Sequence, residues 1–430
     1  MRIALVVHKF PPASYGGTET YTYNLAQGLA TRGHEVSVFY RDDGDGSAFR
    51  EGWQTTAAFK TWRVGRAFVT ATADPARLFF DTFLNRDVEA SFARFLAEAR
   101  PELVHFQHLM LLSVRLPMLV RQAGIPMLLT LHDYWFKCAN SQLVWPDERI
   151  CRGKLAGINC ARCATARVDS PLLKLFRPAF APLFWWRDWL VRRAALCIGR
   201  FISPSQFLAD QYRAVGFPGD KLTVLENGID LDRIRSFPRQ SVADQILRVT
   251  YLGSLAWQKG VHILAAALRG LPPARIRLRI FGNPNVFPDY AARLKDLCDP
   301  HNTVLEGPIP NSRVGQVLAE TDILAVPSLW YENSPVVIQE AHAAGTPVLA
   351  SRLGALSEKV RDGVDGLLVS PGDVAAWRAA LQYLLDTPTE LERLRANVLL
   401  PLPLAEHVKF IEALYTLAVE ERKNTKPTRR

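Results

Sequence analysis

Short runs of consecutive apolar residues alternate with longer stretches of helical periodicity along most of the chain. Such runs are typical of strands buried on both faces, and the periodic stretches are typical of the helices that cover parallel sheets. The first half contains five runs, at residues 3–7, 35–40, 103–107, 127–131 and 197–203. Between the first two, residues 18–31 predict a helix that follows Gly16 and Gly17 and stops before Gly33, so the chain opens with a βαβ unit.

A second series of strands begins after the apolar run 222–225, at residues 248–252, 277–281, 303–306, 323–327 and 347–350. The helices predicted with them cover residues 261–268, 290–298, 311–319, 336–344, 373–385 and 390–397. A chain of 430 residues is longer than one hydrophobic core usually organises. We therefore expect an α/β protein with two Rossmann-like, doubly wound parallel sheets.

Turn-rich sequence at residues 216–220 predicts where the two domains meet. This assigns residues 1–218 to the first domain and 219–404 to the second. An amphipathic helix at residues 405–421 is expected to pack back toward the first domain, and residues 422–430 are expected to form a flexible basic tail.

Composition places the chain among ordinary globular proteins, with 48% apolar and 22% charged residues. The amino terminus lacks the apolar region and small-residue cleavage site of a signal peptide. Charged residues interrupt the best candidate for a membrane span, near residues 184–198. A cytoplasmic location is the expectation that follows.

The net charge of +10 is concentrated in the first half, where residues 1–220 hold 27 Lys/Arg and 19 Asp/Glu. A basic surface attracts anionic lipid headgroups or polyanionic substrates. Nucleic acid is not an expected partner, because no helix-turn-helix, RNP or zinc-finger spacing accompanies the charge.

Two glutamates eight positions apart, Glu332 and Glu340, give the most specific chemical signal. An isolated pair with this spacing is more often a solvated helix face. Here, however, the pair follows a predicted buried strand and brackets a predicted helix start, which is where open α/β folds bind ligands. A helix amino terminus can bind phosphate and a carboxylate can accept hydrogen bonds from a diol, so the segment suits a nucleotide sugar.

In the first domain, the loop after the first strand contains Gly16, Gly17 and Glu19, and His132 and Asp133 follow the strand at 127–131. Glycines allow the backbone to approach a ligand, although a Gly-Gly pair before a helix is more often a tight turn. The loop has no G-x-G-x-x-G pattern, which argues against a nicotinamide dehydrogenase.

Residues 322–328, 332–340 and 341–350 resemble the carboxyl-terminal signature of glycosyltransferase family 4, whose members have the GT-B fold of two Rossmann-like domains facing a cleft. The resemblance continues in order through residues 11–33, 131–133, 202–207, 224–230 and 253–261. It implies a retaining enzyme that transfers sugar from a nucleotide-diphosphate donor to a saccharide or lipid-linked acceptor in glycan, polysaccharide or glycolipid synthesis. It also implies that catalysis requires no metal or other cofactor.

The resemblance assigns a role to each matching position. Glu340 is expected to bind the ribose, Glu332 the donor sugar, and Lys259 the diphosphate, while His132 is expected at the reaction centre. Further donor contacts are expected from Gly16, Gly17, Asn333, Ser334 and Val336, and acceptor contacts from Glu19 and Asp133. Two positions depart from the family pattern, because Ser254 stands where many members have arginine and Pro335 where they tend to have glycine.

Four cysteines, Cys138, Cys151, Cys160 and Cys163, lie in one insert at residues 138–163. The final C-x2-C spacing suits a closed, structural zinc site, and four unconnected thiols are about equally compatible with the pattern. Aromatic residues at 176–191 stand among arginines, which fits either a buried core stripe, the favoured interpretation, or a helix at an anionic membrane surface.

Two other functions remain open from the sequence. One is a non-hydrolysing sugar-nucleotide 2-epimerase, and the other is a catalytically inactive sugar-nucleotide-binding protein. The donor base, the sugar, the acceptor, the linkage and the oligomeric state are also left open, because the selecting contacts lie in loops.

Overall fold

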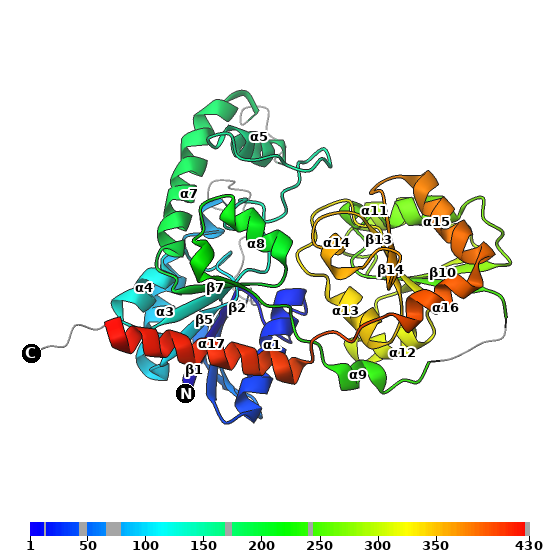
Figure 1. Ribbon diagram of the computed structural model, residues 1–430. Helices are drawn as coiled ribbons and strands as arrows, with labels where there is room; N and C mark the ends of the chain where they lie inside the picture. Colours follow the sequence, from blue (N-terminus) through cyan, green and yellow to red (C-terminus); the bar gives the residue numbers. More distant parts are fainter. Residues whose placement is uncertain (13, 43–49, 66–78, 168–173, 240–243, 426–430) are drawn as a thin grey trace, which may run out of the picture. The chain divides into compact units, whose positions relative to one another are not determined.

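The chain forms two units in the computed structural model, which describes residues 1–430 except 13, 43–49, 66–78, 168–173, 240–243 and 426–430 (Figure 1). Unit 1 comprises Met1–Glu226 and Leu404–Arg430, and unit 2 comprises Asn227–Pro403. The boundary lies beyond residue 218 because strand β8 (Leu222–Val224) pairs with β7 (Arg200–Ser203) in unit 1. The carboxyl-terminal helix α17 (Leu404–Thr425) is also part of unit 1.

The described part of unit 1 is built on a sheet with strand order β3-β4-β2-β1-β5-β6-β7-β8. Its other strands are β1 (Arg2–Val7), β2 (Glu35–Asp42), β3 (Arg50–Thr55), β4 (Lys60–Gly65), β5 (Leu103–Phe106) and β6 (Met127–Thr130). Only the β3 and β4 pair is antiparallel among these neighbours. The antiparallel pair at the edge was not predicted, because the β3 sequence REGWQT contains no apolar run.

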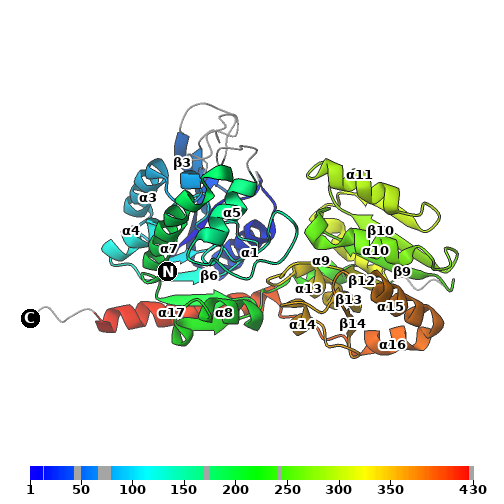
Figure 2. The ribbon, with the colours of Figure 1, turned by 90° about the horizontal axis from the view of Figure 1, so that it is seen from above.

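Helices cover both faces of this sheet, because successive side chains of a strand point to opposite faces. Val38 and Tyr40 of β2 belong to a core that includes residues of α1 (Gly17–Thr31) and α17. Phe39 between them instead contacts Phe92 and Phe95 of α3 (Arg86–Ala99), with ring centroids 5.0 and 5.3 Å apart. Figure 2 shows the layers, with α17 on one side of the sheet and α3 and α4 (Leu116–Gln122) on the other.

Unit 2 contains a fully parallel sheet with strand order β11-β10-β9-β12-β13-β14 in its described residues. Its strands are β9 (Leu247–Leu252), β10 (Ile276–Phe281), β11 (Thr303–Gly307), β12 (Ile323–Val326), β13 (Val348–Ser351) and β14 (Gly366–Val369). Val249 belongs to a core with α10 (Val261–Leu268), α11 (Pro288–Leu297) and α15 (Val374–Asp386). On the opposite face, Leu324 lies in a core with α9 (Leu231–Arg235), α12 (Val314–Ala319) and α13 (Val336–Ala343).

The remaining described helices are α5 (Ile158–Ala166), α7 (Ala181–Ala195), α8 (Gln206–Arg213), α14 (Leu356–Lys359) and α16 (Pro388–Ala396). Short 3-10 turns form η1 (Arg177–Phe180), η2 (Gly219–Lys221), η3 (Trp257–Lys259) and η4 (Asn311–Arg313). The predicted pair of doubly wound α/β domains is thus confirmed.

Strand order reverses once in each sheet, between β1 and β5 in unit 1 and between β9 and β12 in unit 2. At such a switch point the loops that leave the carboxyl ends of the two strands diverge, and the opening between them is where open α/β sheets bind ligands. Lys259 and Glu332 are on these loops in unit 2, and Gly16 is on the loop after β1 in unit 1. His132 and Asp133 instead follow β6, the strand beyond β5.

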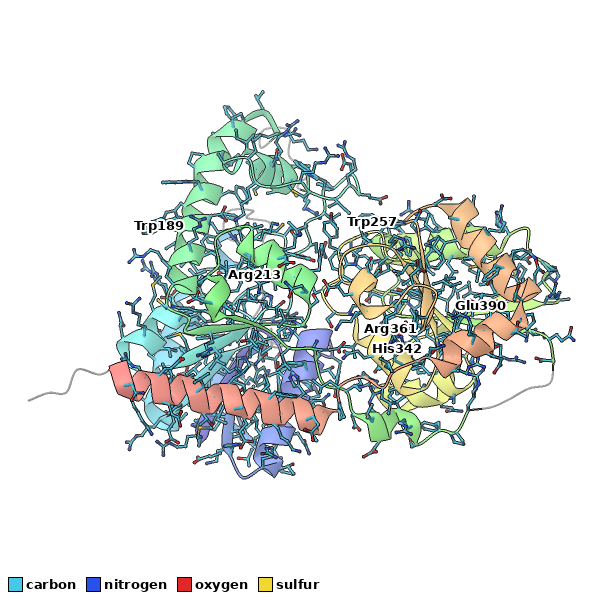
Figure 3. All side chains as sticks on the ribbon, in the orientation of Figure 1. Trp189, Arg213, Trp257, His342, Arg361 and Glu390 are labelled. Atoms are coloured by element: carbon cyan, nitrogen blue, oxygen red, sulfur yellow. The ribbon has the colours of Figure 1, made fainter. Side chains whose placement is uncertain are left out.

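The aromatic segment before β7 is only partly buried. Phe184 on the inner side of α7 is 6% exposed, whereas Trp185 is 65% and Trp189 is 45% exposed. Figure 3 shows Trp189 on the outer side of α7. The favoured interpretation of this segment as a core stripe is therefore wrong for these two tryptophans. In the part of the chain that the structure describes, no helix is long and apolar enough to cross a membrane.

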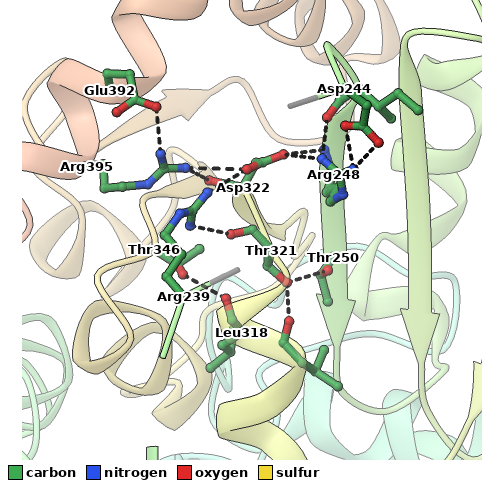
Figure 4. Close-up of polar contacts among 12 residues, drawn as sticks. Arg239, Asp244, Arg248, Thr250, Leu318, Thr321, Asp322, Thr346, Glu392 and Arg395 are labelled. Carbon is green, nitrogen blue, oxygen red and sulfur yellow. Dashed lines mark hydrogen bonds and ion pairs between the residues drawn. The ribbon is translucent and has the colours of Figure 1, made fainter. Parts of the chain in front are cut away.

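A polar cluster around Asp322 joins the amino ends of β9 and β12 (Figure 4). Asp322 Oδ2 accepts a hydrogen bond from the backbone amide of Arg248 at 2.9 Å, and Oδ1 accepts one from Arg239 at 2.6 Å. The Arg395 guanidinium lies 3.5 Å from the same carboxylate. Next to it, the hydroxyl groups of Thr250 and Thr321 are hydrogen-bonded at 2.8 Å. The cluster ties the two central strands together.

Candidate active site

The loop from β9 to α10 brings Lys259 beside the loop that follows β12. Gly260 has φ +70°, and a Cβ at this position would lie 1.9 Å from the carbonyl oxygen of Pro327. Only glycine therefore permits this approach. The Leu329 amide donates to the Gln258 carbonyl at 2.8 Å, which fixes the two loops together.

Glu332 lies on the loop after β12 and is 6% exposed. Its Oε1 accepts hydrogen bonds from Lys259 Nζ at 2.7 Å, Ser328 Oγ at 2.7 Å and Trp330 Nε1 at 2.8 Å. All three donors act on one oxygen, so the carboxylate is held in one orientation. The predicted sugar-binding glutamate and the predicted diphosphate-binding lysine are direct neighbours.

These contacts keep Glu332 ionised. Burial alone would raise its pKa, but the charge of Lys259 and the hydrogen bonds from Lys259, Ser328 and Trp330 hold the pKa below its ordinary value. The Lys259 ammonium also lies 5.2 Å from the centroid of the Trp330 ring, which gives it a second favourable contact.

Glu340 lies inside α13 and is 8% exposed. Its Oε1 accepts a hydrogen bond from Arg233 Nη2 at 2.5 Å. Burial raises the pKa of Glu340, and the neighbouring Arg233 offsets only part of this effect. The two glutamates thus have pKa values shifted in opposite directions.

The first turn of α13 has backbone amides without acceptors in the helix, as every helix start does. Pro335 is the N-cap residue and provides no side-chain cap, so the amide of Val336 begins the turn. Within the described structure, the Ser334 hydroxyl is buried and has no hydrogen-bond partner. Amide donors at a helix start together with a buried hydroxyl are suited to bind an anion.

Residues around the switch point of unit 2 therefore provide a positive charge, hydrogen-bond donors and hydrogen-bond acceptors. Lys259 and the start of α13 provide positive charge and N–H donors, and Glu332 and Glu340 provide fixed acceptors. Asn333 lies between Glu332 and Ser334 and is half-buried. The arrangement can bind a molecule that carries both phosphate and neighbouring hydroxyl groups.

In unit 1, His132 follows β6 and is hydrogen-bonded through Nε2 to Gln107 Oε1 at 2.9 Å. An amide oxygen only accepts, so Nε2 carries the proton. Burial, followed by the charge of His108, lowers the pKa of His132 to about 3. His132 is therefore neutral at physiological pH and can act there as a hydrogen-bonding group but not as a cationic acid.

Asp133 is hydrogen-bonded to His108. His108 Nδ1 accepts from the Met110 amide at 3.0 Å, so Nε2 carries the proton and donates to Asp133 Oδ2 at 2.8 Å. The amide of Trp135 donates to Oδ1 at 2.8 Å. Burial opposes ionisation of Asp133, but His108 and these hydrogen bonds hold its pKa below the ordinary value.

The Glu19 carboxylate packs against the loop that follows β1. Ser14 Oγ donates to Glu19 Oε1 at 3.0 Å, and His8 Nε2 lies 3.6 Å from the same oxygen. A Cβ at Gly16 would lie 2.4 Å from Glu19 Oε2, whereas a Cβ at Gly17 would meet open space. A side chain at position 16 would therefore displace the Glu19 carboxylate, whereas one at position 17 would not.

Within the described residues, the four clustered cysteines are not gathered into a group that could hold the predicted zinc. Among the described residues, no group of three or more His, Cys, Asp or Glu side chains is placed to hold a metal ion. The Cys151 and Cys163 thiols instead lie within donor distance of the carbonyls of Gly153 and Val144. Burial raises the pKa of Cys160 to about 12, so its thiol stays protonated. Cys138 is half-buried in the same insert.

Sequence reasoning missed several residues of this arrangement. Ser328 and Trp330 lie within four positions of Glu332, on the loop that the apolar run 323–327 already marks, so that run was a usable signal. No sequence signal marked Arg233 as a site residue, because it lies 107 positions before Glu340.

Comparison with protein families gives two matches. The family model described as Glycosyltransferase Family 4 matches residues 15–233, and the model described as Glycosyl transferases group 1 matches residues 247–387. Among curated proteins, the glycogen synthase of Mycobacterium tuberculosis strain H37Rv is 26% identical over 415 residues, 91% of this chain and 88% of that protein. The D-inositol 3-phosphate glycosyltransferase of Nocardia farcinica is 34% identical over 194 residues, 42% of this chain and 43% of that protein.

Solved structures share the fold over nearly the whole chain. Sucrose-phosphate synthase from Thermosynechococcus elongatus has a TM-score of 0.63 at 20% identity and covers 98% of each chain. Anabaena Alr3699/HepE, solved in complex with UDP and glucose, has a TM-score of 0.65 at 17% identity and covers 97% of this chain and 99% of its own. These neighbours have the GT-B architecture.

Proposed function

Because the chain belongs to glycosyltransferase family 4 and is a glycosyltransferase, we propose that it transfers a sugar from a nucleotide-diphosphate donor to a saccharide or lipid-linked acceptor, with retention of configuration. The product would be a glycan, a polysaccharide or a glycolipid. Catalysis would need no cofactor beyond the chain itself.

The observation that carries this proposal is the contact between Lys259 and Glu332 at the switch point of unit 2. The two groups come from loops 73 positions apart and lie 2.7 Å from each other. An ammonium beside a fixed carboxylate, next to a helix start, suits a donor that has a diphosphate next to a sugar.

In the proposed mechanism, each group of unit 2 has one task. Lys259 and the Val336 amide bind the diphosphate and stabilise the charge that it gains as the glycosidic bond breaks. Ser334 and Asn333 add hydrogen bonds to the donor. Glu340 accepts hydrogen bonds from the ribose hydroxyls, and Glu332 accepts one from a hydroxyl of the donor sugar through Oε2.

Unit 1 is proposed to bind the acceptor and the reacting sugar. His132 is neutral, and because its Nε2 proton is donated to Gln107, Nδ1 would accept a hydrogen bond from the donor sugar. Asp133 and Glu19 have carboxyl oxygens that can accept hydrogen bonds from acceptor hydroxyls. Gly16 and Gly17 would approach the donor. Retention is proposed to proceed by attack on the face from which the diphosphate leaves, with the departing phosphate taking the acceptor proton.

The test is a transfer assay with the full chain. Thermal stabilisation by a panel of UDP-, GDP- and ADP-sugars selects the donor, because a ligand that binds the folded state raises the unfolding temperature. Transfer is then measured with saccharide and lipid extracts, and the anomeric configuration of the product is determined by NMR.

Glu340→Ala is expected to lower kcat/KM about 100-fold through loss of ribose binding, equivalent to about 2.7 kcal/mol. The matched control is Glu406→Ala, at an exposed position of α17, which should transfer at the wild-type rate. Conversion of the donor to an epimer without acceptor would establish the 2-epimerase instead. Donor binding without any turnover would establish an inactive binding protein, and an inverted product would refute retention.

A further inference from the structure

The outer face of α7 is apolar where helix surfaces are usually polar. Pro182, Trp185, Trp189 and Leu196 are exposed and follow one another at intervals of three to seven residues, which places them on one stripe of the helix. The inner face of the same helix is already buried through Phe184, Leu190, Val191 and Ala194. The outer stripe is therefore not needed for the core of unit 1.

Two arginines lie on the same outer stripe. Arg192 and Arg193 are exposed, and the Arg193 guanidinium lies 4.7 Å from the ring centroid of Trp189. The Arg192 guanidinium donates through Nη2 to the Val215 carbonyl at 3.2 Å, and the residue is nevertheless exposed. Indole rings beside guanidinium groups suit the boundary between water and lipid, where one part of the side chain is apolar and the other is polar.

The sequence around α7 is the most basic part of the chain. Residues 151–200 contain ten Lys/Arg and two Asp/Glu, a net charge of +8, whereas the whole chain has +10. Arg187 is buried against Trp135 and does not contribute to the surface. Arg192 and Arg193 are exposed, and Lys174 and Arg177 are half-buried. A negatively charged partner would therefore be attracted to this region.

We propose that the outer face of α7, formed by Trp185, Trp189, Arg192, Arg193 and Leu196, docks the protein onto an anionic lipid bilayer. The tryptophans insert at the level of the headgroups, and the arginines pair with lipid phosphates. A second copy of the chain is a poorer partner, because a twofold contact would set the arginines of one copy against those of the other. The inference does not depend on the proposed transfer reaction.

The test is binding of the full chain to vesicles by co-sedimentation, without donor or acceptor. Vesicles of phosphatidylcholine alone are compared with vesicles that contain about 30% phosphatidylglycerol. The wild type is expected to bind the anionic vesicles, to bind neutral vesicles at least about ten-fold more weakly, and to be released by 0.5 M salt, which screens the exposed charges.

Two double variants separate the contributions. Trp185→Ala with Trp189→Ala is expected to lower vesicle binding at least about ten-fold, because two large apolar side chains are lost from the contact. Arg192→Gln with Arg193→Gln is expected to lower binding and its salt dependence together. All substituted side chains are exposed, so circular dichroism and thermal unfolding should match the wild type.

Matched controls remove the same kinds of groups from unit 2. Leu399→Ala with Leu400→Ala removes two exposed apolar side chains, and Arg277→Gln with Lys295→Gln removes two exposed charges. Both should bind vesicles as the wild type does. Quenching of tryptophan fluorescence by brominated lipid should be strong in these controls and weaker in the tryptophan variant.

The proposal is overturned if the wild type fails to bind anionic vesicles, or if the tryptophan variant binds them equally well. It is also overturned if sedimentation velocity shows self-association that the tryptophan variant abolishes while vesicle binding is absent. That result would make the face an interface between copies.

Discussion

The two ends of the sheet in unit 2 use the same chemistry for different purposes. At the amino end, Asp322 is bound by arginines, and at the carboxyl end Glu332 is bound by Lys259. In both cases a carboxylate meets a cation at about the distance of a hydrogen bond. A search for charge pairs alone would rank the two ends equally.

The difference lies in what surrounds each pair. Asp322 accepts a hydrogen bond from the backbone amide of Arg248, and neighbouring threonine hydroxyls bond to each other and to helix carbonyls. Glu332 instead receives its hydrogen bonds on Oε1, and the buried Ser334 hydroxyl beside it lacks a partner within the described structure. At the amino end, the polar groups make their hydrogen bonds within the fold. At the carboxyl end, some polar groups can still bind a ligand.

Removing the cation at the carboxyl end should give the largest effect. Lys259→Ala is expected to lower kcat/KM about 100- to 1000-fold, because a preorganised charge on the leaving diphosphate is lost. Lys295→Ala, at an exposed position in the same unit, is the control. Both variants are measured by steady-state kinetics. A loss of less than about three-fold in Lys259→Ala would contradict a donor site at the carboxyl end of the sheet.

The loop geometry behind this pair can be broken without touching a charge. Gly260→Ala is expected to destabilise the chain by about 3 kcal/mol, since a positive φ and a collision with the Pro327 carbonyl act together. Gly363→Ala has a similar φ of +69° with nothing within 4 Å of the added Cβ, and should cost only about 1 kcal/mol. Denaturant unfolding measures both, and equal losses would show that the loop tolerates the collision by moving.

At the amino end, the effect should fall on stability rather than on transfer. Asp322→Asn is expected to lower the free energy of unfolding by about 2 kcal/mol, because the arginines around it lose their shared counter-charge. Transfer at 25 °C should stay within about two-fold of the wild type. A loss of activity without a loss of stability would assign a functional role to this end as well.

The smallest effects concern pH, and they should have opposite signs for the two glutamates. The pKa of Glu332 is lowered in the folded chain, so its contribution to stability is present above the ordinary value of 4.5 and is lost as the pH falls below it. The pKa of Glu340 is raised, so stability declines as the pH rises from 4.5 through the raised value.

Each glutamate can be tested by difference. Subtracting the unfolding curve of Glu332→Gln from that of the wild type should leave a difference that shrinks on acidification. The same subtraction for Glu340→Gln should leave one that grows more favourable to the wild type on acidification. Equal slopes for the two variants would refute the assignment.

Continuous apolar runs allowed most of the fold to be predicted. Strands such as β12, with the sequence ILAV, are buried on both faces. Every residue of such a strand is apolar, so the strand can be recognised in the sequence. The sequence signal was weaker for β3 and β14, because both are edge strands. β3 is largely exposed, and the two leucines of β14 are only partly buried. The doubly wound topology followed from the alternation of strands with helices.

The site was predictable to the extent that its residues lie on loops after buried strands. Glu332 and Lys259 were both chosen for that position, and the structure brings them into contact. Arg233 could not be chosen, because its role depends on how α9 packs beside α13. The exposure of Trp185 and Trp189 could not be predicted either, because an aromatic stripe has the same sequence whether or not another layer covers it.

Helix α17 has a consequence for how the chain is assembled. It supplies Val408, Ile411 and Tyr415 to the core of unit 1, so that core stays incomplete until residues 404–425 have been synthesised. Unit 2 is in effect an inserted domain, and its two ends are joined by the hydrogen bond of 2.9 Å from the Ile229 amide to the Leu402 carbonyl. Residues 227–403 should therefore fold when expressed alone, whereas a chain truncated at residue 226 should aggregate.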